Sequence, residues 1–259
     1  MEGKEMNQLE LLEEANACAR KIKDATLEVD PFKFTVIDNF LSHKLAQDSM
    51  LSFPPLSDPC WEHSNDKGIE VKSRTNWKSE FDIQENIINV IRIVNSSLIL
   101  SAMSELFGIP KLMPDPYFSG GGLNVSEKNG HLDVHVDGNY HDASGLNRRM
   151  NLIIYLNPNW EETWGGEFGI YSNDGHHLVK AVPPLFNRCV IFDSHDKSFH
   201  GLPNPINFPA DDPRRSIILY YYTVAKRPSD QVVVDEPHSA LWRSKGLHDK
   251  RGNRTRGYS

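Results

Sequence analysis

The strongest constraint on the fold is a series of short apolar runs, separated by turn residues, that begins near Tyr117. The runs follow one another with no helical pattern between them: GGGLNV, HLDVHVD, MNLIIYLN, GEFGIY, HHLVKAV, NRCVIFD and RSIILYYYTV. Turn signals such as Asn157-Pro158 and Asn173-Asp174-Gly175 separate them. Many short strands without intervening helices are typical of a sandwich or barrel. We therefore predict a mainly β fold with flanking helices, built on a jelly-roll, double-stranded β-helix core.

The part of the chain before Tyr117 has a different character. Apolar spacing predicts helices over 9–23, from Ser42 to about Phe53, and over 85–107, with a strand over 32–40 between the first two. The segment 54–72 is rich in Pro, Ser, Asp and Asn, and it predicts a long loop beside the active site. We expect one structural domain with three parts: supporting elements over 1–116, a catalytic core over 117–226 and an irregular basic tail over 227–259.

Bulk composition limits the classes of partner. The chain has 259 residues and a net charge of −7, which argues against general attraction to nucleic acid or anionic membranes. No apolar run approaches the ~18 residues of a membrane helix, and the start of the chain lacks the pattern of a signal peptide. Three widely spaced cysteines argue against a disulfide framework, so we expect a cytoplasmic protein. The basic end, from Arg243 to Arg256, leaves a local contact with phosphate open.

The sequence His135-Val136-Asp137, with His200 further along the chain, is the main candidate for chemistry. Residues two apart on a strand point to the same face, so His135 and Asp137 can reach one metal ion. Two imidazoles and one carboxylate form the facial triad of non-haem Fe(II) oxygenases, which leaves positions open for oxidant and co-substrate. The pattern therefore predicts a metal site that holds Fe(II).

The same spacing occurs a second time, four residues earlier, in His131-Leu132-Asp133. On a continuous strand all four side chains would share one face, so strand parity does not separate the two pairs. His195 competes with His200 in the same way. The residues alone leave both choices open.

Several ordered blocks resemble a known family. The blocks HVDGNYHDASGLNRRMNLIIYLNPNW…GGEF, FDSHDKSFHG and RRSIILYYYT resemble the prolyl-4-hydroxylase-like branch of the Fe(II)/2-oxoglutarate oxygenase superfamily, and its bacterial and phage members in particular. The resemblance covers roughly Phe118 to Val224. It implies that the metal ligands are His135, Asp137 and His200, because the family's distal histidine follows a phenylalanine, here Phe192, by eight residues.

The resemblance also implies residues for 2-oxoglutarate, whose distal carboxylate needs a cation inside the barrel. Arg214 and Ser216 share a strand face and resemble the family's R-x-S arrangement, with Arg215 as the alternative. Tyr155 resembles the tyrosine that meets the same carboxylate in relatives, and Asn151 lies on its face. These residues are our predictions for the co-substrate site. Arg148 is more simply explained by a loop salt bridge.

The reaction implied is hydroxylation of an unactivated C–H of a prolyl residue, a free amino acid or another small molecule. O2 and 2-oxoglutarate are consumed, succinate and CO2 are released, and ascorbate is a possible reductant. Asn124 stands where the family's GGGLH block has histidine, which puts the role of that side chain in doubt. Asp137 argues against halogenation, because halogenases of the superfamily lack this carboxylate. The alternatives are an oxidative demethylase of nucleic acid and a non-catalytic jelly-roll metal-binding module.

Overall fold

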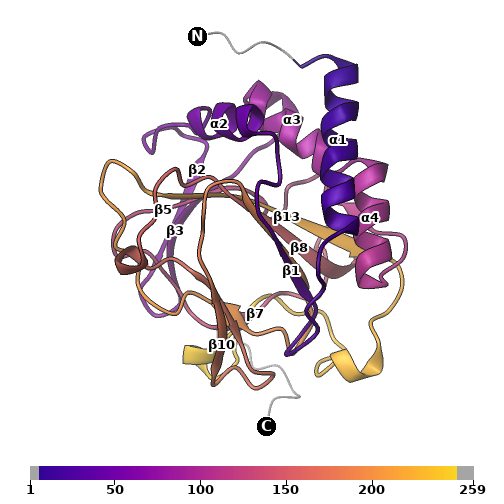
Figure 1. The fold of residues 1–259 in the computed structure, drawn as a ribbon. Helices are drawn as coiled ribbons and strands as arrows, with labels where there is room; N and C mark the ends of the chain where they lie inside the picture. The colour runs from indigo at the N-terminus through magenta and orange to yellow at the C-terminus, as the bar shows by residue number, and fades with distance from the viewer. Residues whose placement is uncertain (1–5, 250–259) are drawn as a thin grey trace.

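Two antiparallel β-sheets face one another, and helices cover the outer side of the larger sheet (Figure 1). The computed structural model describes residues 6–249. Side chains from both sheets meet in one apolar cluster, in which the rings of Phe168 and Phe192 lie 5.1 Å apart. Facing antiparallel sheets of this kind match the predicted jelly-roll core, and the mainly β fold class is confirmed.

The larger sheet contains the long strands of the core. In spatial order its strands are β1 (Phe34–Ile37), β11 (Arg188–Asp193), β8 (Asn147–Tyr155), β13 (Arg214–Thr223), β5 (Gly122–Ser126), β3 (Glu70–Thr75) and β2 (Trp61–Asp66). Two short strands join it, β4 (Met113–Pro114) beside β13 and β6 (His131–Leu132) beside β3. The smaller sheet has the order β10 (Leu178–Val182), β9 (Phe168–Tyr171), β12 (His200–Gly201), β7 (His135–Val136) and β14 (Leu241–Trp242).

Alternation along β8 separates the helix-facing core from the space between the sheets. Leu152 and Ile154 pack in the cluster that contains the helices, whereas Ile153 and Tyr155 belong to the cluster between the sheets. This is the period-two pattern expected of a strand buried on both faces. Strand β13 alternates in the same way, so both strands present every second side chain to the interior.

The helices are α1 (Gln8–Lys23), α2 (His43–Leu51), α3 (Glu85–Val94) and α4 (Ser97–Phe107). The prediction of one helix over 85–107 was wrong, because the chain bends by 47° between α3 and α4. Ser96 adopts an extended backbone at the break and occupies the N-cap position of α4, where its side chain makes no capping hydrogen bond. No single described helix is long and apolar enough to cross a membrane. Taken together, the bent pair α3–α4 meets that requirement by length and composition only, and its apolar side chains lie in the core.

Two further predictions about local structure were wrong. The segment 54–72 is not one long loop, since it contains β2 and the start of β3, which pair from Trp61↔Thr75 to Asp66↔Glu70. Strand β2 lies at the edge of the sheet and is largely exposed, which explains its polar sequence. The run 131–137 is not one strand either. Strand β6 belongs to the larger sheet and β7 to the smaller one.

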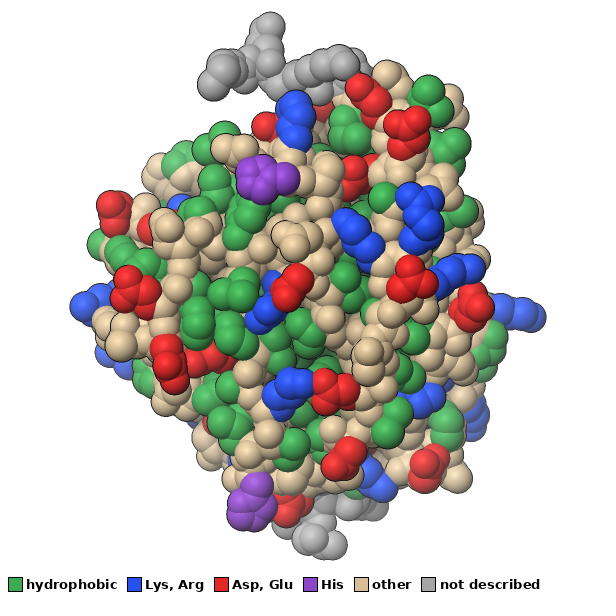
Figure 2. Space-filling view, viewed as in Figure 1, with side chains coloured by type: hydrophobic (Ala, Val, Ile, Leu, Met, Phe, Trp, Pro, Cys, Tyr) green, Lys and Arg blue, Asp and Glu red, His purple; other side chains and the backbone are tan. Residues whose placement is uncertain are grey.

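The segment predicted to be an irregular tail contributes β14 to the smaller sheet beside β7. Residues 250–259, which carry part of the basic run proposed to contact phosphate, lie outside the described residues. On the face seen in Figure 2, Lys and Arg side chains are interspersed with Asp and Glu rather than gathered in one patch. That face therefore offers no extended basic surface.

Candidate metal centre

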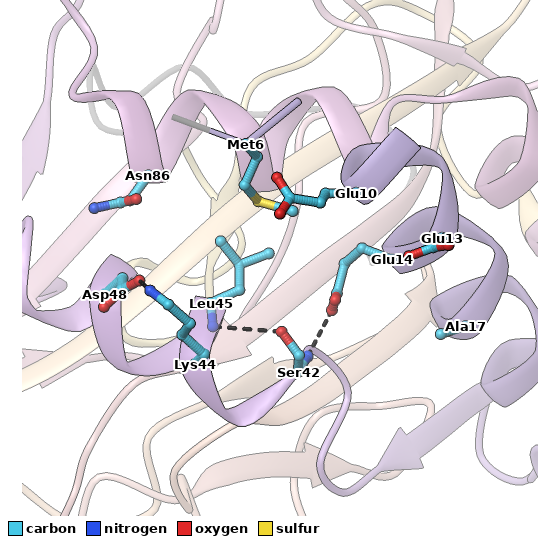
Figure 3. Close-up of a pocket in the computed structure, with 10 residues that line it drawn as sticks. All are labelled: Met6, Glu10, Glu13, Glu14, Ala17, Ser42, Lys44, Leu45, Asp48 and Asn86. Atoms are coloured by element: carbon cyan, nitrogen blue, oxygen red, sulfur yellow. Dashed lines mark hydrogen bonds and ion pairs between the residues drawn. The ribbon is translucent and has the colours of Figure 1, made fainter. Parts of the chain in front are cut away.

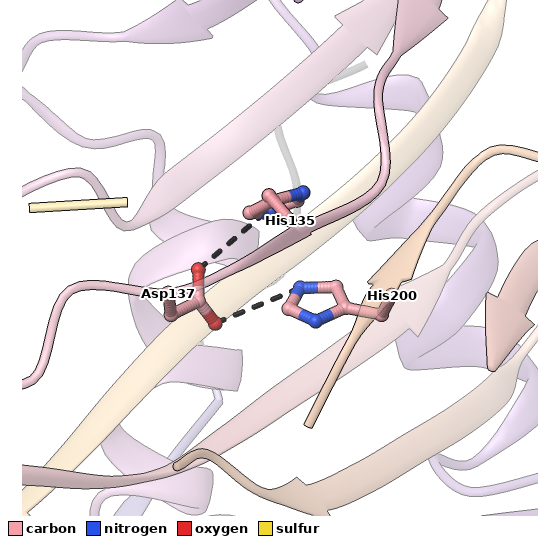
Figure 4. A group of neighbouring side chains, drawn as sticks. All are labelled: His135, Asp137 and His200. Carbon is pink, nitrogen blue, oxygen red and sulfur yellow. Dashed lines mark ion pairs between the residues drawn. The ribbon is translucent and has the colours of Figure 1, made fainter. Parts of the chain in front are cut away.

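His135, Asp137 and His200 meet between the sheets, at the inner face of the smaller one (Figure 4). His135 lies on β7 and His200 on β12, and the two residues are direct partners in the antiparallel ladder. Asp137 follows β7 immediately. Its Oδ1 lies 3.6 Å from Nε2 of His135, and its Oδ2 lies 3.6 Å from Nε2 of His200. All three side chains are buried or nearly so.

Backbone carbonyls fix the two imidazoles so that their Nε2 atoms can bind a metal. Nδ1 of His135 donates to the carbonyl of Asp133 at 2.8 Å, and Nδ1 of His200 donates to that of Ser198 at 2.9 Å. A carbonyl can only accept, so each Nδ1 carries a proton and Nε2 is the ring nitrogen that faces the other ligands. Burial, together with the neighbouring His135, lowers the pKa of His200 to about 4. This imidazole is therefore neutral at ordinary pH.

Asp137 is held as an ionised carboxylate by neighbouring donors. Its Oδ2 accepts a hydrogen bond of 2.7 Å from Nδ2 of Asn151 and lies 3.1 Å from Nη2 of Arg148. Burial by itself would raise the pKa of Asp137, but the Arg148 cation holds it well below its ordinary value. Arg148 also donates to Oδ1 of Asn151 and stacks on the ring of Tyr220, 3.5 Å from its centroid. Two imidazoles and one oriented carboxylate are a donor set that fits Fe(II).

The structure separates the competing residues from this group. His131 lies on β6 in the larger sheet, and Oδ2 of Asp133 accepts a hydrogen bond from the backbone of Ser244 at 2.8 Å. His195 is buried elsewhere, and its Nδ1 accepts from the backbone of Lys197 at 3.1 Å. The assumption of one strand parity for 131–137 was wrong, because the chain crosses from one sheet to the other between β6 and β7.

The three proposed metal ligands, His135, Asp137 and His200, are called the metal group below. A cavity extends from this group between the sheets, and Arg214 and Tyr155 line it. Nε of Arg214 donates to the carbonyl of Gly166 at 2.8 Å, and its guanidinium lies 5.0 Å from the centre of the Tyr155 ring. Arg215 points to the opposite face of β13, where it pairs with Asp212 at 2.6 Å. Of the two arginines, only Arg214 reaches the interior.

The polar groups in this cavity fit a carboxylate. Arg214 is buried and forms no ion pair with any described residue, and burial lowers its pKa although Tyr155 and Glu167 offset part of that effect. Ser216 is the ladder partner of both Tyr155 and Asn124. The hydroxyl oxygens of Tyr155 and Ser216 are buried without a hydrogen-bond partner. A buried cation and two unpartnered hydroxyls are costly unless a ligand completes them.

On its other side the metal group adjoins a cleft that opens to the surface. Tyr140 and Tyr222 line this cleft together with Arg148, Lys72 and Trp242, and His135 and Asp137 form its inner end. Sequence reasoning did not single out Trp242 or Lys72, because neither belongs to a motif. A second, separate hollow lies between α1 and α2 and is lined by carboxylates such as Glu10 and Glu13 (Figure 3). None of its described lining residues is a histidine, and none of them also lines the cavity or the cleft beside the proposed metal ligands.

Comparisons with known proteins show a related superfamily and fold. Residues 121–222 match the sequence model of the 2OG-Fe(II) oxygenase superfamily, so the resemblance is confirmed over that segment. The matched superfamily is named for the two predicted cofactors, Fe(II) and 2-oxoglutarate, and the segment contains His135, Asp137 and His200. Prolyl 3-hydroxylase OGFOD1 of Mus musculus is 31% identical over 86 residues, which are 32% of this chain and 15% of the relative. The Xenopus laevis protein of the same name is 34% identical over 64 residues, which are 23% of this chain and 12% of the relative. The matched regions thus span less than a sixth of these relatives.

Solved structures share the fold. A prolyl hydroxylase from Trichoplax adhaerens, in complex with a peptide fragment of hypoxia inducible factor, has a TM-score of 0.58 and 19% identity, covering 84% of this chain and 94% of that one. A Pseudomonas putida prolyl-4-hydroxylase has a TM-score of 0.52 and 16% identity, covering 80% and 98% of the two chains. At these identities the likeness concerns the fold alone.

Proposed function

We propose that this chain is an Fe(II)- and 2-oxoglutarate-dependent dioxygenase that hydroxylates a prolyl residue within a peptide or protein. One observation carries the proposal. A buried His135–Asp137–His200 group with free ligand atoms lies next to a cavity whose buried arginine, Arg214, forms no ion pair among the described residues. This pairing of metal donors with a cation for a dicarboxylate occurs within the segment that matches the superfamily.

When bound, Fe(II) and 2-oxoglutarate supply the activation of O2 and the oxidising power for attack on a C–H bond. One oxygen atom enters the hydroxyl group of the product, and the other enters succinate as CO2 is released. The four electrons that reduce O2 come from the decarboxylation of 2-oxoglutarate and from the C–H bond. The contribution of the protein is to bind, to orient and to exclude water.

Named residues perform these tasks. His135 and His200 offer Nε2 because backbone carbonyls hold their Nδ1 protons, and Asn151 and Arg148 hold the carboxylate of Asp137. We assign the far carboxylate of 2-oxoglutarate to Arg214, with the hydroxyl groups of Tyr155 and Ser216 as further donors. Asn151 then supports the metal ligand rather than the co-substrate. Apolar side chains of Phe168, Phe192 and Ile218 line the cavity between these groups and exclude water.

The outer cleft favours a residue inside a peptide over a free amino acid. A free amino acid carries an α-carboxylate, which needs an unpaired cation when it is buried. Among the described residues, each Lys and Arg that lines the cleft is already ion-paired: Lys72 with Glu70, Arg74 with Glu62 and Arg148 with Asp137. The names of the relatives, prolyl 3-hydroxylase and prolyl hydroxylase with a bound peptide, support a prolyl substrate.

The proposal is tested by anaerobic loading with Fe(II) and 2-oxoglutarate, followed by addition of ¹⁸O2. We expect succinate to form, and we expect proline-containing peptides, but not free L-proline, to gain one labelled oxygen atom. Asp137→Ala should abolish both products. The proposal fails if the loaded protein forms no succinate with any substrate. Turnover of free proline with no turnover of peptides would overturn the peptide assignment while leaving the dioxygenase in place.

A further inference from the structure

The C-terminal strap, residues 227–249, lies outside the segment that matches the superfamily, which ends at residue 222. Nevertheless, it reaches the metal group directly. Trp242 on β14 is the ladder partner of His135 on β7, and its indole ring stacks on the imidazole at 4.5 Å with 26° between the planes. On another side of the same imidazole, the ring of His200 lies 4.3 Å away. His135 is therefore held between two rings.

The middle of the strap is fixed where it passes the loop after Asp137. Asn139 accepts a hydrogen bond of 2.8 Å from the backbone of His238 and donates one of 3.0 Å to the carbonyl of Glu236. A Cβ atom on Gly138 would lie 2.9 Å from the carbonyl oxygen of His238, so glycine permits this close crossing. The strap therefore runs against the backbone next to a proposed metal ligand.

Both ends of the strap are anchored to buried or structured groups. Asp196 accepts hydrogen bonds from the backbone of Val233 at 2.8 Å and Val234 at 2.9 Å, and it pairs with Arg227 at 3.0 Å. At the other end, the backbone of Ser244 donates to Asp133 at 2.8 Å. Asp133 is the residue whose carbonyl accepts from Nδ1 of His135. The strap thus supports His135 both through the Trp242 ring and through the backbone that fixes its tautomer.

We propose that Trp242 is a positioning residue for the metal ligand His135, and that the strap completes the metal centre and forms one wall of the substrate cleft. The inference rests on the proposed function, since it takes His135 as a ligand of Fe(II). Trp242 is 3% exposed, and His238, Ser239 and Ala240 line the cleft beside it. The strap therefore links substrate access to the geometry of the metal ligand.

Strand β14 offers a matched control. Leu241 is buried with Val136, Tyr171 and other apolar residues in a separate cluster, so it anchors the same strand without contacting the imidazole. Nε1 of Trp242 is buried without a hydrogen-bond partner, so Trp242→Phe keeps a stacked ring and loses no hydrogen bond. Trp242→Leu keeps apolar volume without an aromatic face and serves as the aliphatic variant if Trp242→Ala does not fold.

The experiment measures Co(II) binding to the metal-free protein by calorimetry, together with the Co(II) visible spectrum. We expect Trp242→Ala or Trp242→Leu to weaken Co(II) binding by about tenfold or more and to alter the spectrum, as for other residues that support a metal ligand. Trp242→Phe should bind within about threefold of the parent, as should Leu241→Ala, although the latter lowers thermal stability.

The outcomes distinguish failure of the proposed metal function from failure of the positioning role of Trp242. If the parent protein binds no Co(II), the proposed metal function fails. If the parent binds Co(II) and the aliphatic variants bind it equally well with an unchanged spectrum, only the role of Trp242 is overturned. An equal loss of Co(II) binding in Leu241→Ala would also overturn it, because the effect would then arise from strap docking in general.

Discussion

Replacement of Arg214 by methionine tests the assignment of the co-substrate most directly. Methionine keeps much of the side-chain length but removes the charge and the planar donor group. In the structure the guanidinium is buried, donates one hydrogen bond to Gly166 and forms no ion pair with a described residue. A carboxylate bound there would be the counter-ion of a buried cation.

The magnitude follows from that environment. Removing one partner of a buried, hydrogen-bonded charge pair costs about 3–5 kcal/mol, and each factor of ten in affinity corresponds to about 1.4 kcal/mol. Arg214→Met should therefore raise the dissociation constant of 2-oxoglutarate by two to three orders of magnitude. Metal affinity should change little, because Arg214 contacts none of the three proposed ligands. Arg214→Lys keeps the charge but loses the forked geometry of the guanidinium. Its dissociation constant for 2-oxoglutarate should therefore lie between those of the parent and Arg214→Met.

Calorimetric titration of 2-oxoglutarate into the Co(II)-loaded protein measures this change, and Arg215→Met is the matched control. Arg215 lies on the opposite face of β13 in an ion pair with Asp212, so its loss should leave 2-oxoglutarate binding within about twofold. The metal-free Arg214→Met protein should lose no more than about 3 kcal/mol of stability, since the carbonyl of Gly166 loses its donor while a buried charge is removed. Strong loss of binding in Arg215→Met with none in Arg214→Met would refute the reasoning.

Three further changes test the metal centre and its surroundings. Asn151→Ala removes the 2.7 Å hydrogen bond to Asp137 and should weaken Co(II) binding by about 10- to 100-fold; an unchanged affinity would contradict the supporting role. His135→Ala should abolish Co(II) binding whereas His131→Ala should preserve it, and the reverse result would move the site to the other sheet. His195 is buried neutral with a pKa of about 4, so the unfolded chain binds more protons and stability is lost as pH falls from about 6.5 to 4, by up to about 3 kcal/mol. Denaturant unfolding of His195→Gln should show a smaller loss of stability between pH 6.5 and 4 than the parent does. If stability fell with pH equally steeply in both proteins, His195 would be excluded as the cause.

The interior-facing residues of β8 and β13 could be predicted from the sequence because a strand has only two faces. Once RRSIILYYYT is taken as a strand, Arg214 and Ser216 share a face by necessity, and Arg215 takes the other. The same argument places Tyr155 with Asn151 on β8. Apolar side chains are buried both in the helix-packed core and between the two sheets. The sequence pattern therefore predicted the strands but not which face of each strand lines the cavity.

Other features of the fold and the site could not be predicted from the spacing of apolar and polar residues. The edge strand β2 is polar because solvent covers it, and a polar run with Asp and Asn resembles a loop. The choice between the two histidine pairs depended on a crossing between sheets after Leu132, which no period in the sequence marks. Trp242 and His135 are 107 positions apart, and their contact arises only from the pairing of β14 with β7.

Strand β8 gives a physical reason why the metal group and the co-substrate cavity lie so close together. Asn151 donates to Asp137, and Tyr155, four residues later on the same face, lies beside Arg214. In the ladder Asn151 is opposite Tyr220, which stacks on Arg148, and Tyr155 is opposite Ser216. A slip of one residue between β8 and β13 would turn the side chains of Asn151 and Tyr155 away from the interior at once. The strongly apolar alternate face of β8, packed against the helices, makes such a slip costly, so the hydrophobic core fixes the spacing between the metal donors and the cation for 2-oxoglutarate.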